Sequence, residues 1–171
     1  MSAVDPRDRP DDHDTTALLD DRAMWVALVR GEDRPGTLTA LTSVFSDRGV
    51  SFESLSTGAV DGAVGTIAVT FTTTARRQAL LLRTVARLAV VSAVQVRRAD
   101  DPAVLAAAIV QLPTGVSLDI RDLDVRITSV GGPSGAGQRF FLEGSLAEVS
   151  HVVEHAREAG AIGTATVILG M

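Results

Sequence analysis

The residues from Asp33 to Leu38 combine side-chain and backbone groups that can bind a small charged molecule. Pro35 and Gly36 precede an apolar pattern of helical period, so a helix is predicted to begin in this stretch. The first N–H groups of a helix have no partner within it, which leaves those of Gly36, Thr37 and Leu38 free for an anion. Asp33 offers a carboxylate to a cation. Together these groups suit the carboxylate and ammonium of an amino acid, although Asp33 can equally serve only to cap the helix.

Three other groups of residues have spacings that suggest chemistry, and each has a plainer interpretation. His151 and His155 lie four residues apart on one predicted helix face, but no third ligand accompanies them, so no metal site is predicted. Residues 131–137 are rich in glycine, yet they join two predicted strands and carry no lysine, which favours a flexible hairpin over a phosphate-binding loop. Three serines lack a nucleophile elbow and an acidic third member, which argues against a hydrolase: Ser134, Ser145 and Ser150.

Missing residue types narrow the chemistry further. The chain contains no Cys, no Lys and no Tyr, which removes thiolate nucleophiles, Schiff-base and phosphate-loop lysines, and tyrosine general acids. We therefore predict that the protein is not an enzyme and needs no cofactor. Arg supplies all 16 basic positions, and Asn is absent as well; because the missing types have AT-rich codons, this usage indicates a GC-rich genome rather than phosphate binding.

Composition and charge indicate the cellular compartment of the protein and argue against membranes and nucleic acids as partners. No apolar run approaches the roughly 20 residues that span a bilayer, and the acidic N-terminus lacks the apolar segment of a signal peptide. The absence of Cys fits the cytoplasm. Residues 23–171 carry 13 Arg against 14 Asp and Glu, with no basic stripe in the sequence. The expectation is a cytoplasmic protein that binds neither a membrane nor nucleic acid.

The Asp33–Leu38 stretch lies within a pattern of four predicted strands and two predicted helices. Met24–Val29 is an unbroken apolar run typical of a central strand, and the helix that follows is predicted to end at Gly49 in a left-handed cap. Later elements are indicated by alternating residues at 67–72 and 94–97 and by a stripe at Leu81, Val85 and Leu88. The order βαββαβ over residues 23–98 predicts an α+β, ferredoxin-like fold with both helices on one face of the sheet.

The second half of the chain predicts a smaller unit. Strands are indicated at 125–130, 138–143 and 164–169, and Ser145 with Glu148 forms a capping box for a helix before the last of them. Residues 100–112 are ambiguous. A helix starting at Asp100 through the alanine-rich segment to Leu112 is one interpretation, and a strand at 108–112 is the other.

These patterns divide the chain into three regions. Residues 1–22 hold seven acidic and three basic residues, a balance of 3 − 7 = −4, with little apolar clustering, and are predicted to be a disordered acidic tail. Residues 23–99 form the βαββαβ domain, and residues 100–171 form a C-terminal α+β domain.

Two segments of the first domain resemble a known family. The segment Arg34-Pro35-Gly36-Thr37-Leu38 is followed by Val44-Phe45-Ser46-Asp47-Arg48-Gly49-Val50-Ser51-Phe52-Glu53-Ser54-Leu55. This succession resembles an ACT domain and, more narrowly, the start of the regulatory (small) subunit of acetolactate synthase. Further on, Glu143-Gly144-Ser145 before a helix and Gly160-Ala161-Ile162 before a strand resemble the C-terminal domain of the same subunits. The resemblance implies that residues 100–171 are a degenerate ACT-like domain.

The resemblance also implies a binding site shared between two protomers. In the family, the loop after the first strand of one protomer faces the start of the second strand of the other. Carried over to this chain, the ligand-binding residues are Asp33, Gly36, Thr37 and Leu38, with Ser51 and Phe52 from the partner of a homodimer. The chain departs from the family where Ser51 replaces the usual Asn and where Asp33 replaces what is often an Asn. Val64-Gly65-Thr66-Ile67 also replaces a Ser-Arg-Met-Thr entry to the third strand. These departures affect the binding of valine, the family's usual effector.

Two functions follow from this resemblance. The first is a non-catalytic regulatory subunit that binds a small amino acid and modulates an acetolactate synthase-type catalytic subunit in branched-chain amino acid biosynthesis. The alternative is a stand-alone amino-acid-sensing ACT protein that controls a different partner, which the departures above favour. Catalysis by the chain itself is disfavoured by its lack of Cys, Lys and Tyr.

Overall fold

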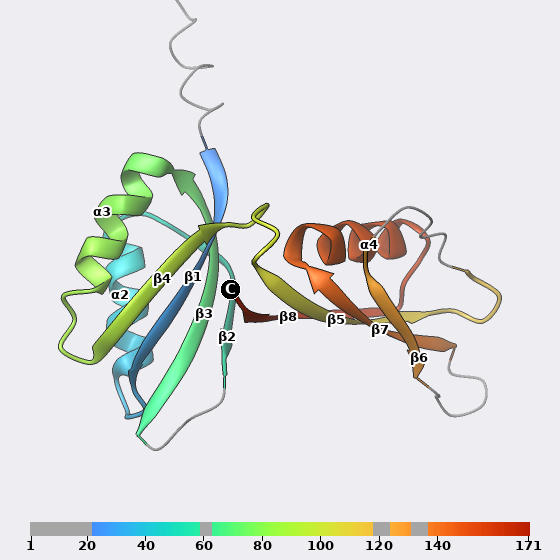
Figure 1. Cartoon of the computed structure of the whole chain (residues 1–171), viewed down its shortest axis with the longest axis horizontal. Coiled ribbons are helices and arrows are strands. Elements are labelled where there is room, and N and C mark those ends of the chain that lie inside the picture. The colour runs from blue at the N-terminus through green and yellow to red at the C-terminus, as the bar shows by residue number, and fades with distance from the viewer. Residues whose placement is uncertain (1–21, 59–62, 118–123, 131–136) are drawn as a thin grey trace, which may run out of the picture.

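The computed structural model describes residues 22–58, 63–117, 124–130 and 137–171, which form two antiparallel four-stranded sheets (Figure 1). The first sheet has the order β2-β3-β1-β4. Its strands are β1 (Arg22–Glu32), β2 (Phe52–Thr57), β3 (Val64–Thr74) and β4 (Val91–Arg98), with α2 (Thr37–Asp47) after β1 and α3 (Ala75–Val85) after β3. This order confirms the predicted βαββαβ arrangement and its ferredoxin-like α+β fold.

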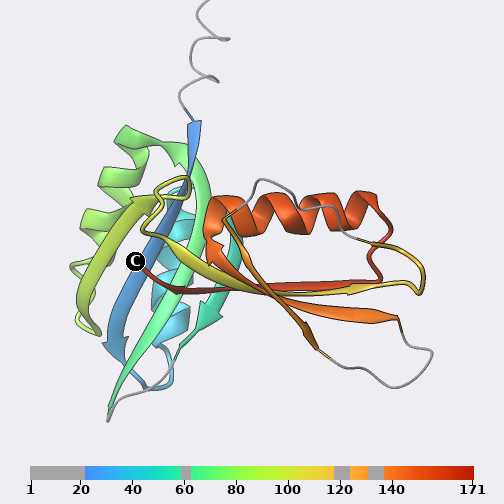
Figure 2. The same cartoon turned by 45° about the vertical axis from the view of Figure 1, so that its right-hand side comes forward.

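The two helices cover one face of the first sheet, on the side away from the second sheet (Figures 1 and 2). Leu41 and Phe45 of α2 are buried against this sheet together with Leu81 of α3. The ring of Phe45 meets those of Phe52 and Phe71 edge to face, with centroids 5.2 Å apart in both pairs. Burying one such side chain contributes about 1.5–3 kcal/mol, so this packing fixes the position of α2 and of its N-terminus.

The end of α2 confirms the cap predicted at Gly49. Gly49 has a φ of 62°, a left-handed conformation that glycine adopts without a steric penalty. Its N–H donates to the carbonyl of Ser46 at 2.9 Å, and the N–H of Val50 donates to that of Phe45 at 3.0 Å. These two bonds form a Schellman motif, which turns the chain directly into β2.

The second sheet repeats the topology of the first. Its order is β6-β7-β5-β8, with β5 in the position of β1. The elements are β5 (Leu105–Leu112), β6 (Arg126–Val130), β7 (Gln138–Ser145), α4 (Leu146–Glu158) and β8 (Gly163–Gly170). The predicted cap of α4 is present, since the N–H of Glu148 donates to Ser145 Oγ at 3.3 Å. No counterpart of α2 occurs among the described residues between β5 and β6.

The helix predicted from Asp100 to Leu112 is wrong, because residues 105–112 are the central strand β5. The strand interpretation is correct, although β5 begins three residues before 108. Ala106 and Ala108 face α4 and are almost completely buried. Their small side chains let the helix lie close to the sheet, so tertiary packing overrides the high helix propensity of alanine.

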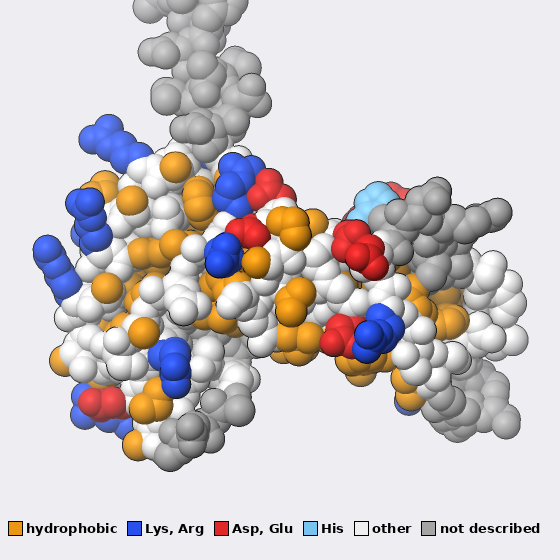
Figure 3. Space-filling model, viewed as in Figure 1, with side chains coloured by type: hydrophobic (Ala, Val, Ile, Leu, Met, Phe, Trp, Pro, Cys, Tyr) orange, Lys and Arg blue, Asp and Glu red, His pale blue; other side chains and the backbone are white. Residues whose placement is uncertain are grey.

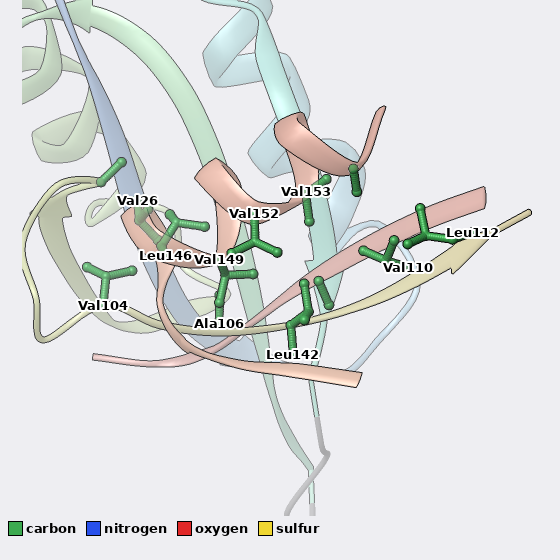
Figure 4. Close-up of a cluster of buried hydrophobic side chains, with 13 residues drawn as sticks. Val26, Val104, Ala106, Val110, Leu112, Leu142, Leu146, Val149, Val152 and Val153 are labelled. Carbon is green, nitrogen blue, oxygen red and sulfur yellow. The ribbon is translucent and has the colours of Figure 1, made fainter. Parts of the chain in front are cut away.

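The two sheets share part of one apolar core. Val26 of β1 is fully buried in a cluster that otherwise comes from residues 99–156, including Val104, Leu146 and Val149 (Figure 4). The start of α4 therefore packs on the face of the first sheet that α2 and α3 leave open. A displacement of β1 would be felt directly at α4.

Two predictions fall outside the described residues. Of the acidic tail predicted at residues 1–22, only Arg22 is described, as the first residue of β1. Of the hairpin loop predicted at 131–137, only Gly137 is described. None of the helices in the described ranges has the length and apolar character needed to cross a membrane.

Candidate functional site

The loop between β1 and α2 leads into a helix whose N-terminus has no side-chain cap. Gly36 is the N-cap residue, with a φ of 92°, and no side chain accepts a hydrogen bond from the first turn. The predicted capping role of Asp33 is therefore wrong. The left-handed turn at Gly36 instead points the chain so that Thr37 Oγ1 donates to the carbonyl of Glu32 at 2.8 Å.

This geometry leaves backbone donors available at the start of α2. The N–H of Thr37 makes a long bond of 3.3 Å to the carbonyl of Arg34, and the first intrahelical bond runs from Ala40 to Gly36 at 2.8 Å. The N–H groups of Gly36 and Leu38 have no partner within the helix, and the helix dipole adds a partial positive charge there. These donors lack a side-chain cap, and anion binding at this helix end stays a prediction.

A cavity of about 230 Å³ lies beside this loop. Three predicted site residues line it, namely Asp33, Thr37 and Leu38. Gly36 stands at the helix end with no atom within 4 Å of where its Cβ would be. The remaining wall comes from β1, from the β1–α2 loop and from the adjoining ends of β2 and β3: Val29, Gly31, Glu32, Arg34, Thr57, Gly58, Gly65, Thr66 and Ile67.

The local sequence does not predict the wall formed by β2 and β3. Residues 64–67 differ from the family pattern, but no local pattern predicts that they lie beside the Asp33–Leu38 stretch. The antiparallel register places them there, because Thr57 pairs with Ile67 and the N–H of Asp33 donates to the carbonyl of Ala63 at 2.8 Å. Glycines at 58 and 65 keep side chains out of the opening.

Backbone contacts hold the β1 side of the cavity in place. The N–H of Glu32 donates to the carbonyl of Val90 at 2.8 Å. Gly31 is buried at this contact, and a Cβ there would lie 2.4 Å from the same carbonyl oxygen, so the close approach requires glycine. The loop is thus fixed from both sides by β3 and by the turn before β4.

Charges of both signs surround the opening. Glu32 and Arg34 form an ion pair of 2.7 Å, and both side chains are more than half exposed. Among the described residues the carboxylate of Asp33 has no ion pair and no hydrogen bond, and it is exposed. A free carboxylate, free helix N–H groups and an apolar wall therefore meet at one cavity.

Ser51 and Phe52 do not line this cavity within one protomer. Phe52 is half-buried against Phe45, and Ser51 is exposed just before β2. Thr57, at the cavity end of β2, is six residues away from Ser51, or about 20 Å along an extended strand. A contribution from these two residues to the site requires a second copy of the chain, as predicted for a homodimer.

The histidines and serines considered in the sequence form no further site within the described residues. His155 lies 3.8 Å from Glu158, and no group of three or more metal-ligating side chains occurs within the described ranges. Ser145 and Ser150 lie on or next to α4, where Ser145 is occupied as its cap.

Comparison with known proteins finds a family that matches both helices and most of the first sheet. Residues 25–89 match the sequence model of the ACT domain. The acetolactate synthase small subunit from Thermotoga maritima aligns in structure over 86% of this chain and 96% of its own, with a TM-score of 0.63 and 14% identity. The ligand-free regulatory subunit of aspartate kinase from Thermus thermophilus aligns over 82% and 93%, with a TM-score of 0.45 and 13% identity. No curated protein matches the chain in sequence. Residues 25–89 are therefore similar in sequence to the ACT domain, and the two-sheet fold resembles that of an acetolactate synthase small subunit.

Proposed function

We propose that this chain is a non-catalytic regulatory protein that binds a small amino acid in the cavity beside the β1–α2 loop. The observation that carries the proposal is the meeting of the uncapped α2 N-terminus with the free carboxylate of Asp33 at a cavity of an ACT domain. The ammonium of the ligand pairs with Asp33, and its carboxylate accepts from the N–H groups of Gly36 and Leu38.

The size and walls of the cavity indicate the class of side chain. Its volume of about 230 Å³ is below the range of about 300–1,000 Å³ that accommodates drug-sized ligands. Val29, Leu38 and Ile67 contribute aliphatic surface. A small aliphatic amino acid such as valine, leucine or isoleucine fits this combination, with Ser51 and Phe52 of the second copy completing the site.

We further propose that residues 23–99 act as the sensing domain and residues 100–171 as the domain that transmits its state. Val26 supports this division of roles, because it belongs to β1 but is buried in the core of the second sheet. The regulated partner in this proposal is an acetolactate synthase-type catalytic subunit, in keeping with the similarity of the whole fold to a small subunit of that enzyme.

A stand-alone amino-acid sensor that controls a different partner is the second candidate. Two observations favour it: the residues at 51 and 64–67 depart from the family, and the described part of the second sheet has one helix where the first has two. Capture of partners from the native cells with the tagged protein separates the two candidates. An acetolactate synthase catalytic subunit among them supports the first, and its absence beside another enzyme supports the second.

Isothermal titration with valine, leucine and isoleucine tests the site itself. Because Gly36 has a φ of 92°, any L residue there strains the backbone by about 1–2 kcal/mol. Gly36→Ala imposes this strain alone, whereas Gly36→Asp also sets a carboxylate against the N–H groups that the ligand needs. We expect binding by the wild type and by Gly36→Ala, and none by Gly36→Asp. Absence of heat with all three amino acids, or equal binding by both variants, contradicts the proposed site.

A further inference from the structure

The outer side of α3 carries a row of arginines. Arg76 and Arg83 lie seven residues apart on α3, which places them on one face of the helix. Arg87 lies in the turn that follows α3, and all three are exposed. Arg77 lies next to this row and is also exposed. Arg48, after α2, joins it because its Nη2 donates to Thr84 Oγ1 at 3.0 Å. We call these five residues the arginine face.

The arginine face has almost no acidic counterpart among the described residues. Residues 37–48 and 75–87, which comprise both helices and the residues directly after them, contain five Arg and one acidic residue, Asp47, a balance of 5 − 1 = +4. The ion pairs of the described ranges involve other arginines, at positions 34, 97, 98, 126 and 157. Figure 3 shows basic side chains standing out along the edge of the molecule that α3 forms.

The position of two of these arginines is unfavourable for the helix itself. Arg76 and Arg77 lie in the first turn of α3, which has no acidic residue. A helix N-terminus carries a partial positive charge, so cations there are repelled and anions are attracted. The arginine face therefore lacks a negative partner at the end where one would stabilise the helix most.

An acidic segment of the same chain enters the structure at this end. Residues 1–21 contain seven Asp and two Arg, a balance of 2 − 7 = −5. Arg22 follows directly and pairs in the sheet with Thr74, the N-cap residue of α3. The segment therefore joins the fold beside the first turn of α3.

The length of the segment is sufficient to cover the arginine face. With 11 residues, α3 is about 16 Å long. Asp14 is eight residues before Arg22, which corresponds to about 27 Å of extended chain. Aspartates from position 14 to position 21 can thus reach each arginine of the row, and those from 5 to 12 reach beyond it.

We propose that residues 1–21 bind along the arginine face of their own chain, with their aspartates paired to its guanidinium groups and to the α3 N-terminus. Charge is the basis of this contact, since Leu18 and Leu19 are the only large apolar residues between Val4 and the start of β1. The segment then shields a basic surface, so that an acidic partner must displace it to reach α3.

A spin label tests this contact, and the absence of Cys makes the labelling specific. Thr15→Cys keeps every charge of the segment and carries a nitroxide ten residues or fewer from its aspartates. In the full-length protein at 0.05 M salt we expect the label to broaden the NMR signals of amides in α3 and to leave those of α4 sharp. Raising the salt to 1 M shortens the screening length to about 3 Å and should abolish the broadening.

Charge reversal supplies the matched control. Arg76→Glu with Arg83→Glu should remove the broadening, whereas Arg126→Glu with Arg157→Glu changes the net charge equally and should leave it. Equal broadening of α3 and α4, broadening that survives 1 M salt, or an equal response to both double variants would overturn the proposal. Broadening seen only between a labelled copy and a separate isotope-enriched copy would assign the segment to a neighbouring molecule and overturn the contact within one chain.

Discussion

Thr37 and Glu32 close the β1–α2 loop from the inside, through a hydrogen bond of 2.8 Å from the threonine hydroxyl to the glutamate carbonyl. Thr37 is only 6% exposed, so this bond forms away from water. It joins the first residue of α2 to the last residue of β1. The two elements that flank the proposed amino-acid site are held together at this point.

Thr37→Val keeps the shape of the side chain but removes the donor. We expect a loss of about 1 kcal/mol in the free energy of unfolding, because a typical buried hydrogen bond contributes about 0.5–1.5 kcal/mol. Amino-acid binding should weaken as well, since the loop loses an anchor. Urea denaturation measures the first effect and titration calorimetry the second. Thr39→Val is the control: Thr39 is exposed two residues further along α2, and its substitution should change stability by less than about 0.5 kcal/mol.

Gly31→Ala tests the close contact between β1 and the turn before β4. The new Cβ would lie 2.4 Å from the carbonyl oxygen of Val90, which itself accepts a hydrogen bond from Glu32. Overpacking of this kind costs about 1–3 kcal/mol, and the displaced loop should also bind an amino acid less well. Gly170→Ala is the matched control, because no atom lies within 4 Å of its Cβ position. Similar melting temperatures for the two variants would show that the turn adjusts without cost.

The turn between the two sheets predicts a dependence on pH. The N–H of Ala103 and then the guanidinium of Arg97 hold the pKa of Asp101 below its usual value, through bonds of 2.9 and 2.8 Å. A lowered pKa in the folded state means that the contribution to stability is complete above the ordinary value of about 3.9 and is lost as the pH falls through the lowered value. A carboxyl titration by NMR should therefore give a midpoint for Asp101 below 3.9. A midpoint at or above that value would show that these bonds do not persist in solution.

The first domain was predictable because its local patterns agree with its tertiary contacts. The stripe of Leu41 and Phe45, the cap at Gly49 and the alternation in β3 each indicate one structure, and the packing of α2 on the sheet requires the same one. The alanine-rich strand β5 is the opposite case. Its residues favour a helix locally, and only the approach of α4 to Ala106 and Ala108 makes a strand the better state.

The site was predictable only in part, for a related reason. The donors at the start of α2 follow from local sequence, whereas the opposite wall, at Thr57 and Gly65, is brought there by strand register. The capping role expected of Asp33 failed because the positive φ of Gly36 decides how the chain enters the helix. A dihedral angle of this kind is set by the closure of the whole loop and leaves no mark in the spacing of residues.

The last prediction concerns the second copy of the chain. Ser51 is exposed and about 20 Å along β2 from the cavity, so Ser51→Asp should change stability by less than about 0.5 kcal/mol. If the site is shared across a homodimer, the same variant should nevertheless abolish amino-acid binding. Light scattering at micromolar concentration should give the mass of a dimer for both proteins, as expected for a sheet with exposed edge strands.

Mixing two variants that do not bind separates a shared site from an indirect effect. After exchange of subunits between Ser51→Asp and Gly36→Asp, half of the dimers contain one copy of each. In such a dimer one site combines the intact loop of the first variant with the intact Ser51 of the second, and the other site carries both changes. Binding should therefore return to about one quarter of the wild-type capacity, because the two-fold symmetry gives each dimer two equivalent sites. If Ser51 acted only within its own protomer, every site in the mixture would carry one change or the other, and no binding would return.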